Sequence, residues 1–240
     1  MTTNQQINGH RVVSSEEWLR ESRTLLKKEK ELTRLSDELS AERRKLPWTK
    51  VTKRYVFDGP DGQETLADLF GQNSQLIVYH FMFGPGWQEG CPSCSLVADH
   101  FDGSLAHLSN RNVALAIISR APYPEIETFK RRMGWRFRWV SSNQNDFNRD
   151  FHVSFTQEEL ARGDCYNFQT TSFPVEEGPG ISVFARNAAG EVFHTYSSYG
   201  RGCEPLLGVY FFLDRVPSGR HEDGLPFPMA WVRHHDSYAA

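Results

Sequence analysis

The sequence predicts an α/β protein in which a central mixed sheet is flanked by helices. The apolar runs Gln75–Phe83 and Val113–Ser119 are typical of strands that are buried on both faces. Each run is followed by an amphipathic segment with helical spacing. From Val51 onward strand and helix patterns alternate, as they do where helices join parallel strands. The first of the two apolar runs should lie at the centre of the sheet.

The other elements follow from local signals. Val51–Phe57 is predicted to be a strand that ends in the turn Asp58–Gly62, and Leu66–Phe70 to be a short helix. A longer helix is expected over Cys91–Asn110, with an irregularity at Asp102–Gly103. The remaining predicted elements are a helix over Pro124–Met133, a hairpin of Ile181–Ala185 and Glu191–Tyr196, and a helix over Leu206–Leu213.

Residues 1–47 are predicted to form a helical extension to this domain. Ser14 and Glu17 have the spacing of a capping box, and Pro47 marks the far end of the helix. Glu21 and Lys28 stand at heptad positions where a coiled coil has leucine. We therefore expect the apolar seam to pack on the protein's own domain or on a neighbour, and a homodimer through this helix stays open. The seam repeats every seven residues and consists of Trp18, Leu25, Leu32, Leu39 and Leu46.

The main domain is expected over residues 48–214. Within it, residues 141–180 form an irregular segment rich in aromatic and turn residues. A segment of this length between core elements is typical of a functional lid or a peripheral insertion. It precedes the final hairpin. Residues 215–240 are rich in Gly, Pro and His and are expected to be a tail that packs on the domain.

The run Gly90-Cys91-Pro92-Ser93-Cys94 carries the functional prediction, because a CxxC dithiol between a strand and a helix indicates redox chemistry. Proline suits the first helical position, which places Cys91 over the free amides and the positive end of the helix dipole. The pKa of Cys91 should therefore fall below about 8.5. Cys94 lies about one turn later, where it can resolve a mixed disulfide. We predict a thiol-disulfide oxidoreductase with Cys91 as the nucleophile.

Two other interpretations of the dithiol stay open. A structural zinc site would need more ligands, but Cys165 and Cys203 are isolated and no second CxxC follows. The pair could also be inert and buried, as free cysteines often are. We expect no metal and no cofactor.

Candidate supporting residues lie near the dithiol and at the strand ends. His80 and Glu89 are the nearest candidates for moving protons, although a polar residue in an apolar strand is more often a hydrogen-bonded core residue. Arg120 follows the strand Val113–Ser119, at the end where ligands gather in open α/β sheets. It could stabilise the Cys91 thiolate, bind an anionic substrate or form a salt bridge.

Charge and hydropathy limit the partners. The 240 residues contain 27 Lys and Arg against 30 Asp and Glu, which gives a formal net charge of −3. The chain therefore has no excess of positive charge that would favour binding to nucleic acid or to an anionic membrane. No apolar run reaches the roughly 20 residues of a membrane span, and no signal-peptide core appears. We expect a cytoplasmic protein whose partners are protein or small-molecule disulfides.

The predicted order of elements resembles a thioredoxin fold with an extra leading strand and helix. In that fold a cis-proline just before the final hairpin faces the dithiol, and Pro179 matches this position. We expect Pro179 to be cis and to face Cys91, with an ordinary trans turn as the alternative. Departing from the better-known thioredoxins, Gly90 rather than tryptophan precedes the first cysteine, and Trp87 stands four residues before it.

The chain also resembles, over nearly its whole length, a bacterial thioredoxin-like family of unknown function labelled predicted dithiol-disulfide oxidoreductases. This resemblance implies the fold and a dithiol activity. It rests on the segments Tyr79–Pro85, Gly90–Cys94, Arg131–Trp135, Val192–Ser197 and Met229–His235.

Two further function classes stay open. One is a thiol peroxidase, in which Cys91 would be oxidised to a sulfenic acid that Cys94 resolves. Peroxiredoxins usually have a hydroxyl residue three positions before the reactive cysteine, where this chain has Gln88. The other is a non-enzymatic binding module that assembles through the N-terminal helix and the aromatic insertion.

Overall fold

The N-terminal unit of the protein is dominated by one long helix. The structure is a computed structural model that describes residues 6–7, 9–163 and 165–239, and it divides into the units Met1–Pro47 and Trp48–Ala240. The first unit contains β1 (Gln6–Ile7), β2 (His10–Arg11) and α1 (Ser15–Arg43). The predicted cap is present, since the Glu17 amide donates to Ser14 Oγ at 3.2 Å. No side chain of α1 is buried, and Trp18, Leu25, Leu32 and Leu39 are all exposed.

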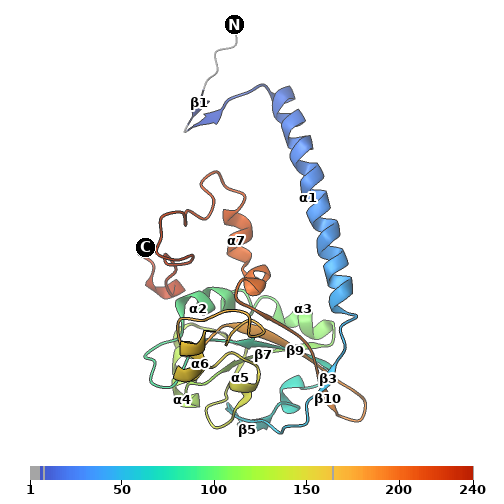
Figure 1. Ribbon diagram of the computed structural model, residues 1–240, viewed down its shortest axis with the longest axis vertical. Coiled ribbons are helices and arrows are strands. Elements are labelled where there is room, and N and C mark those ends of the chain that lie inside the picture. The colour runs from blue at the N-terminus through green and yellow to red at the C-terminus, as the bar shows by residue number, and fades with distance from the viewer. Residues whose placement is uncertain (1–5, 8, 164, 240) are drawn as a thin grey trace. The chain divides into compact units, whose positions relative to one another are not determined.

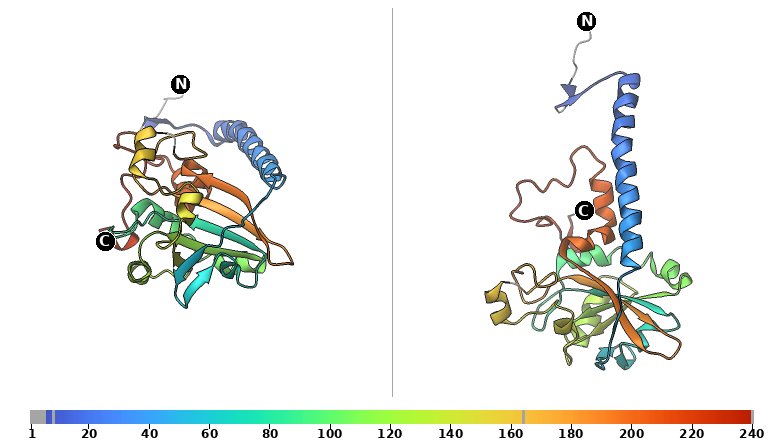
Figure 2. Two further views of the ribbon diagram at one scale, coloured as in Figure 1. Left: turned by 60° about the horizontal axis from the view of Figure 1, so that its bottom comes forward. Right: turned by 45° about the vertical axis from the view of Figure 1, so that its right-hand side comes forward.

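The second unit is built on a twisted sheet of eight strands among the described residues, in the order β3-β10-β9-β6-β7-β8-β4-β5 (Figures 1 and 2). β6 pairs in parallel with β7 and antiparallel with β9, so the first apolar run is central as predicted. The strands are β3 (Thr49–Lys50), β4 (Val56–Gly59), β5 (Gly62–Thr65), β6 (Gln75–His80), β7 (Val113–Ser119), β8 (Arg138–Ser141), β9 (Gly180–Arg186) and β10 (Val192–Tyr199).

Helical segments cover both faces of this sheet. One face carries the larger core cluster, which joins α2, α4 and the region of α7, and the other carries a cluster that includes η1 and α5. The helices are α2 (Pro92–Ala98), α3 (Leu105–Asn110), α4 (Tyr123–Arg132), α5 (Phe147–Asp150), α6 (Gln157–Arg162) and α7 (Gly208–Leu213). The 3₁₀ helices are η1 (Asp68–Phe70), η2 (Gly200–Leu206) and η3 (His235–Ser237).

The topology confirms the predicted α/β, thioredoxin-like fold class. A parallel pair, β6 and β7, is connected through α2 and α3, and the antiparallel hairpin of β9 and β10 lies on the other side of β6. The helical segments η2 and α7 then follow this hairpin. The bounds of β7 agree with the predicted strand over Val113–Ser119.

Three predicted elements differ from the structure. The run Val51–Phe57 is a strand only at its last two residues, since β3 ends at Lys50 and β4 begins at Val56. The run Gln75–Phe83 leaves the strand after His80. The helix expected over Cys91–Asn110 is interrupted between α2 and α3, where the Asp102 carboxylate accepts hydrogen bonds from the amides of Arg136 (2.9 Å) and Phe137 (3.0 Å).

The inserted segment before the final hairpin is more ordered than its composition suggests. It contains α5 and α6, and Thr156 and Glu159 form a capping box at the start of α6. An aromatic cluster that contains Phe155, Tyr166 and Tyr199 ties the segment to β10. None of the helices that the structure describes is long and apolar enough to cross a membrane.

The exposed seam of α1 leads to a prediction about assembly. Burying large apolar side chains contributes roughly 1.5 to 3 kcal/mol each, so we expect the seam to be covered either by the protein's own domain or by a second copy, and the second copy is the case that sedimentation tests. Deleting residues 1–45 should then convert a dimer to a monomer in sedimentation experiments. Leu25→Gln with Leu32→Gln should have the same effect, whereas Lys27→Gln with Arg34→Gln, on the opposite helix face, should leave the mass unchanged. A monomeric full chain would contradict this prediction.

Candidate functional site

The dithiol lies where the chain returns from the end of β6 into α2. The Cys91 amide donates to the Met82 carbonyl at 3.0 Å, and Cys91 is the residue that precedes α2, with Pro92 as its first residue. Gly90 is required here, because a Cβ at this position would lie 2.5 Å from the Phe81 ring and 2.8 Å from the Phe129 ring. The tight fit explains why the residue before the first cysteine is glycine and not tryptophan.

The two thiols have opposite acidities. The Cys94 thiol donates a hydrogen bond to the Cys91 sulfur, and together with the amides of Ser93 and Cys94 it lowers the pKa of Cys91 to about 7 against the effect of burial. Burial raises the pKa of Cys94 well above its ordinary value, and the neighbouring Cys91 raises it further. Cys91 is partly accessible and Cys94 is buried. Cys91 therefore has the properties of an attacking thiolate and Cys94 those of a protonated partner.

Tyr79 is the functional residue that the sequence interpretation missed. Its hydroxyl donates a hydrogen bond to the Cys94 sulfur, and the Met82 amide donates another, so both oppose the rise in the pKa of Cys94. Burial and the nearby Cys94 raise the pKa of Tyr79 well above its ordinary value. Tyr79 is thus a protonated donor beside the second thiol. The signal in the sequence was its place on β6, next to His80.

Both thiols open into one apolar cavity of about 660 Å³. Its walls come from the inserted segment, η2, α7 and the tail that follows α7. Pro179 lines the cavity with the dithiol, and so does Cys203. The described lining residues are Tyr79, Met82, Cys91, Ser93, Cys94, Val97, Phe173, Pro174, Val175, Pro179, Gly200, Arg201, Cys203, Glu204, Leu207, Tyr210, Glu222, Phe227, Pro228 and Met229.

His80 is not the proton-transfer group that its position suggested. Its ring stacks with Phe147 and Phe151, its Nε2 forms a hydrogen bond of 2.9 Å with Ser182 Oγ, and its Nδ1 has no hydrogen-bond partner. Burial lowers the pKa of His80 to about 3, with a smaller contribution from His194, so the imidazole stays neutral. The side chain belongs to the core on the other face of the sheet, because neighbouring strand residues point to opposite faces.

Arg120 forms the salt bridge that was one of its three predicted roles. Its Nη1 donates to Glu177 Oε1 at 2.7 Å, and Ser154 Oγ donates to the other oxygen of the same carboxylate at 2.6 Å. Burial raises the pKa of Glu177, while the bonds from Ser154 and Arg120 oppose the rise. Arg120 is not among the described residues that line the cavity, so its guanidinium holds the insertion near β7 instead of facing the thiols.

The predicted cis bond before Pro179 is wrong. The described residues contain no cis peptide bond. The trans chain at this point is held by a hydrogen bond from the Gly178 amide to the Val153 carbonyl (2.8 Å) and by the Tyr166 hydroxyl, which donates to the Pro179 carbonyl. Pro179 still lines the cavity onto which Cys91 and Cys94 open.

Glu89 and Trp87 flank the dithiol without lining the cavity. Glu89 accepts a hydrogen bond from Arg132 Nη1 at 2.5 Å, so it is part of an ion pair between the loop and α4. Trp87 packs against the larger core cluster. Its ring also lies close to Gly84, since a Cβ added to Gly84 would be only 3.1 Å from the Trp87 ring nitrogen. Both residues hold the loop that leads to Cys91.

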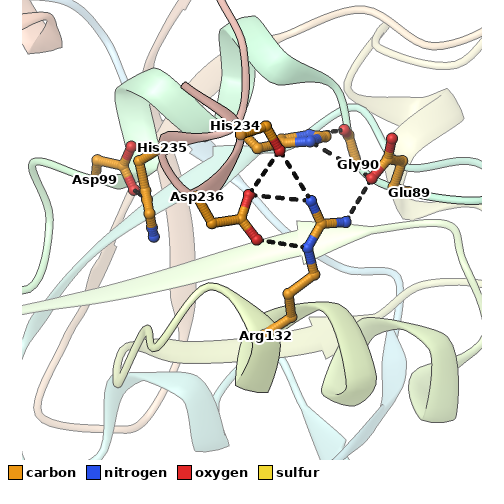
Figure 3. A network of polar contacts seen from close by, with 8 residues as sticks. Glu89, Gly90, Asp99, Arg132, His234, His235 and Asp236 are labelled. Carbon is orange, nitrogen blue, oxygen red and sulfur yellow. Dashed lines mark hydrogen bonds and ion pairs between the residues drawn. The ribbon is translucent and has the colours of Figure 1, made fainter. Parts of the chain in front are cut away.

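A polar network from the end of the tail closes over this loop (Figure 3). The buried His234 donates from Nε2 to the Gly90 carbonyl at 2.8 Å, and its Nδ1 lies 3.5 Å from Glu89. Arg132 binds Asp236 through Nε (2.7 Å) and Nη2 (3.0 Å). His235 donates to Asp99, just after α2, at 2.7 Å. Adjacent histidines thus fasten the tail to both ends of α2.

The four cysteines are free thiols. Cys203 faces the same cavity as the dithiol, and burial raises its pKa to about 12, whereas Cys165 lies in the separate aromatic cluster of the insertion. Within residues 6–7, 9–163 and 165–239, no three His, Cys, Asp or Glu side chains are grouped to hold a metal ion. Two cysteines alone do not make the four-ligand set of a structural zinc site.

Comparison with known proteins identifies the family. Residues 7–238 match the family described as "Bacterial protein of unknown function (DUF899)". The chain belongs to this family. No curated protein sequence matches it.

Several solved structures resemble the chain at low identity. A PrxQ mutant from Xylella fastidiosa is 13% identical, with a TM-score of 0.42 over 65% of this chain and 86% of that one. Peroxidoxin BcpB from Mycobacterium tuberculosis is 12% identical, with a TM-score of 0.46 over 68% and 94%. Peroxiredoxin Q from Xanthomonas campestris is 13% identical, with a TM-score of 0.45 over 64% and 87%. The function must therefore be inferred from the residues of this chain.

The hydrogen bond from Cys94 leads to a prediction about acidity. Cys94→Ala removes the donor, so the pKa of Cys91 should rise from about 7 toward its ordinary value of 9.0. Cys94→Ser keeps a hydroxyl donor and should keep most of the shift. Because the thiolate is the reactive form, the pH midpoint of Cys91 alkylation, followed by peptide mass spectrometry, should move upward in Cys94→Ala alone. Equal midpoints in the two variants would contradict this origin of the acidity.

Proposed function

We propose that this protein is a thiol-disulfide oxidoreductase in which Cys91 attacks and Cys94 resolves. The observation that carries the proposal is the placement of two free thiols on one cavity, with Cys91 partly accessible just before α2 and Cys94 buried within α2. The pKa of Cys91 is about 7, while that of Cys94 lies well above its ordinary value. Its partners are protein or small-molecule disulfides, and its place is the cytoplasm, where a CxxC pair is more often catalytic than structural.

The acidity of Cys91 has a calculable effect. At pH 7 about half of a thiol with this pKa is ionised, against about one part in a hundred for a thiol at 9.0, which is roughly a fiftyfold gain in thiolate. A more acidic thiolate is a weaker nucleophile, and this effect reduces the gain to roughly sixfold. This net advantage is larger, about twelvefold, well below pH 7, and it is lost near pH 8, where the thiol at 9.0 also begins to ionise.

The exchange runs in two steps. The Cys91 thiolate attacks one sulfur of a substrate disulfide, which forms a mixed disulfide and releases the other sulfur as a thiolate. Cys94 then loses its proton and attacks the Cys91 sulfur, which releases the second substrate thiolate and forms the Cys91–Cys94 disulfide. Two electrons pass from the protein to the substrate. A dithiol reductant is needed to start another cycle, and with an oxidising partner the same steps run in reverse.

Trapping of the mixed disulfide tests this assignment. Cys94→Ser should accumulate an adduct on Cys91 when mixed with 2-hydroxyethyl disulfide, because the resolving thiol is absent. Cys91→Ser should form no adduct at a comparable rate. Cys203→Ser is the matched control, since this thiol lines the same cavity, and it should behave like the wild type. Intact mass measured against time distinguishes the three variants.

Three other results would reject the proposal, one from the trapping experiment and two from assays of the wild type with disulfides and with peroxides. Adducts formed equally by Cys91→Ser and Cys94→Ser would show that neither thiol is specialised. Consumption of peroxides without any exchange of disulfides would favour a thiol peroxidase. If the wild type reacts with neither class of compound, a binding module is the better interpretation.

The hydrogen bond from Tyr79 to Cys94 gives a prediction about the second step. Tyr79→Phe removes a donor that stabilises the Cys94 thiolate, so the pKa of Cys94 should rise further and resolution should slow several-fold. The first attack by Cys91 should be nearly unchanged. Stopped-flow measurement with rapid acid quenching separates the two rates. Slowing of the first step by the same factor would instead indicate a general effect on packing around this buried ring.

A further inference from the structure

We propose that the disulfide substrate is a small, uncharged and apolar molecule that enters the cavity beside Cys91. This inference rests on the proposed oxidoreductase function. The supporting observation is that a cavity of about 660 Å³, which is in the size range of small-molecule sites, opens onto both thiols.

Apolar side chains from distant segments form most of the cavity wall. Residues from α2, η2, the insertion and the tail all contribute to it. They include Val97, Phe173, Val175, Leu207, Phe227 and Met229. Each methylene group that moves from water into such a wall contributes about 0.8 kcal/mol, which is about fourfold in an equilibrium constant. The wall can therefore distinguish alkyl chains by their length.

The charged groups of the wall are already paired with protein atoms. Arg201, the one cation among the described lining residues, donates from Nε to Glu204 at 2.9 Å. Glu222 accepts hydrogen bonds through Oε1 from the Tyr210 hydroxyl (2.8 Å) and from the Trp231 indole (2.7 Å). Two carboxylates thus face one cation, so the charged groups among the described lining residues carry a net negative charge, which disfavours an anion. An anionic disulfide such as glutathione disulfide fits this wall poorly.

The reaction in the cavity is the exchange already described, applied to a dialkyl disulfide. The Cys91 thiolate attacks one substrate sulfur and releases one alkanethiolate, which takes a proton from solvent. Cys94 then displaces the second alkanethiolate from Cys91. The substrate gains two electrons and two protons, and the protein becomes the Cys91–Cys94 disulfide. A dithiol reductant restores the thiols.

A series of alkyl disulfides tests the inference in single turnovers. The reduced protein is mixed with dimethyl, diethyl or dipropyl disulfide, with 2-hydroxyethyl disulfide, or with glutathione disulfide. Each rate constant is divided by that of free 2-mercaptoethanol with the same compound, which removes intrinsic reactivity. We expect the corrected rate constant to rise about fourfold or more at each step of the alkyl series. Glutathione disulfide should react more slowly than diethyl disulfide.

A pair of phenylalanine variants locates the effect. Phe227 lines the cavity and is exposed, so Phe227→Ser should lower the corrected rate constant for dipropyl disulfide roughly fivefold without unfolding the protein. Phe212 on α7 is exposed and lies outside the cavity lining, and Phe212→Ser should leave the rate constant unchanged. Circular dichroism checks that both variants are folded.

The outcomes separate this inference from the proposed function. If corrected rate constants do not depend on alkyl length, or if glutathione disulfide reacts fastest, the substrate class is wrong while the oxidoreductase function stands. Equal effects of the two phenylalanine variants would likewise overturn the role of the cavity. If no disulfide reacts faster with the protein than with free thiol, the proposed function itself fails.

Discussion

A single stretch of backbone after β6 holds both thiols in position. The Phe81 amide donates to the Ile118 carbonyl at 3.0 Å, so this stretch continues along the edge of β7 after β6 ends. Both backbone groups of the next residue, Met82, contact the dithiol. The Met82 carbonyl accepts a hydrogen bond from the Cys91 amide, and the Met82 amide donates one to the Cys94 sulfur. The start of α2 is thereby tied to the sheet. The acidity of Cys91 and the position of the cavity depend on this junction.

The central strands, the fold class and the dithiol were predictable from local pattern, but the faces of β6 were not. Both faces of this strand are buried, so its sequence shows no polar and apolar alternation that would tell which side α2 covers. His80 is the polar residue in the apolar run, yet Tyr79 is the neighbour that contacts Cys94. A shift of one residue along a strand exchanges the two faces.

Contacts between residues that are far apart in the sequence could not be predicted from local sequence pattern. Arg120 pairs with Glu177, a residue 57 positions later, and no local signal shows which of its three predicted roles applies. The cavity wall needs contributions from the insertion and from residues after α7, whose composition shows no regular period. The short edge strands β3 and β5 were not predicted, for a related reason. Two to four residues are too few to display a pattern.

The fastening of the tail to the dithiol loop has a consequence for biosynthesis. Gly90 and His234 are 144 residues apart in the sequence, although the His234 side chain donates a hydrogen bond to the Gly90 carbonyl. At translation rates of about 5 to 20 residues per second, the ribosome needs on the order of ten seconds to add this stretch. During that interval the two cysteines have been made but the wall that contains Phe227 and Met229 has not. A nascent chain therefore presents its dithiol to cellular oxidants before the cavity can select what reaches it.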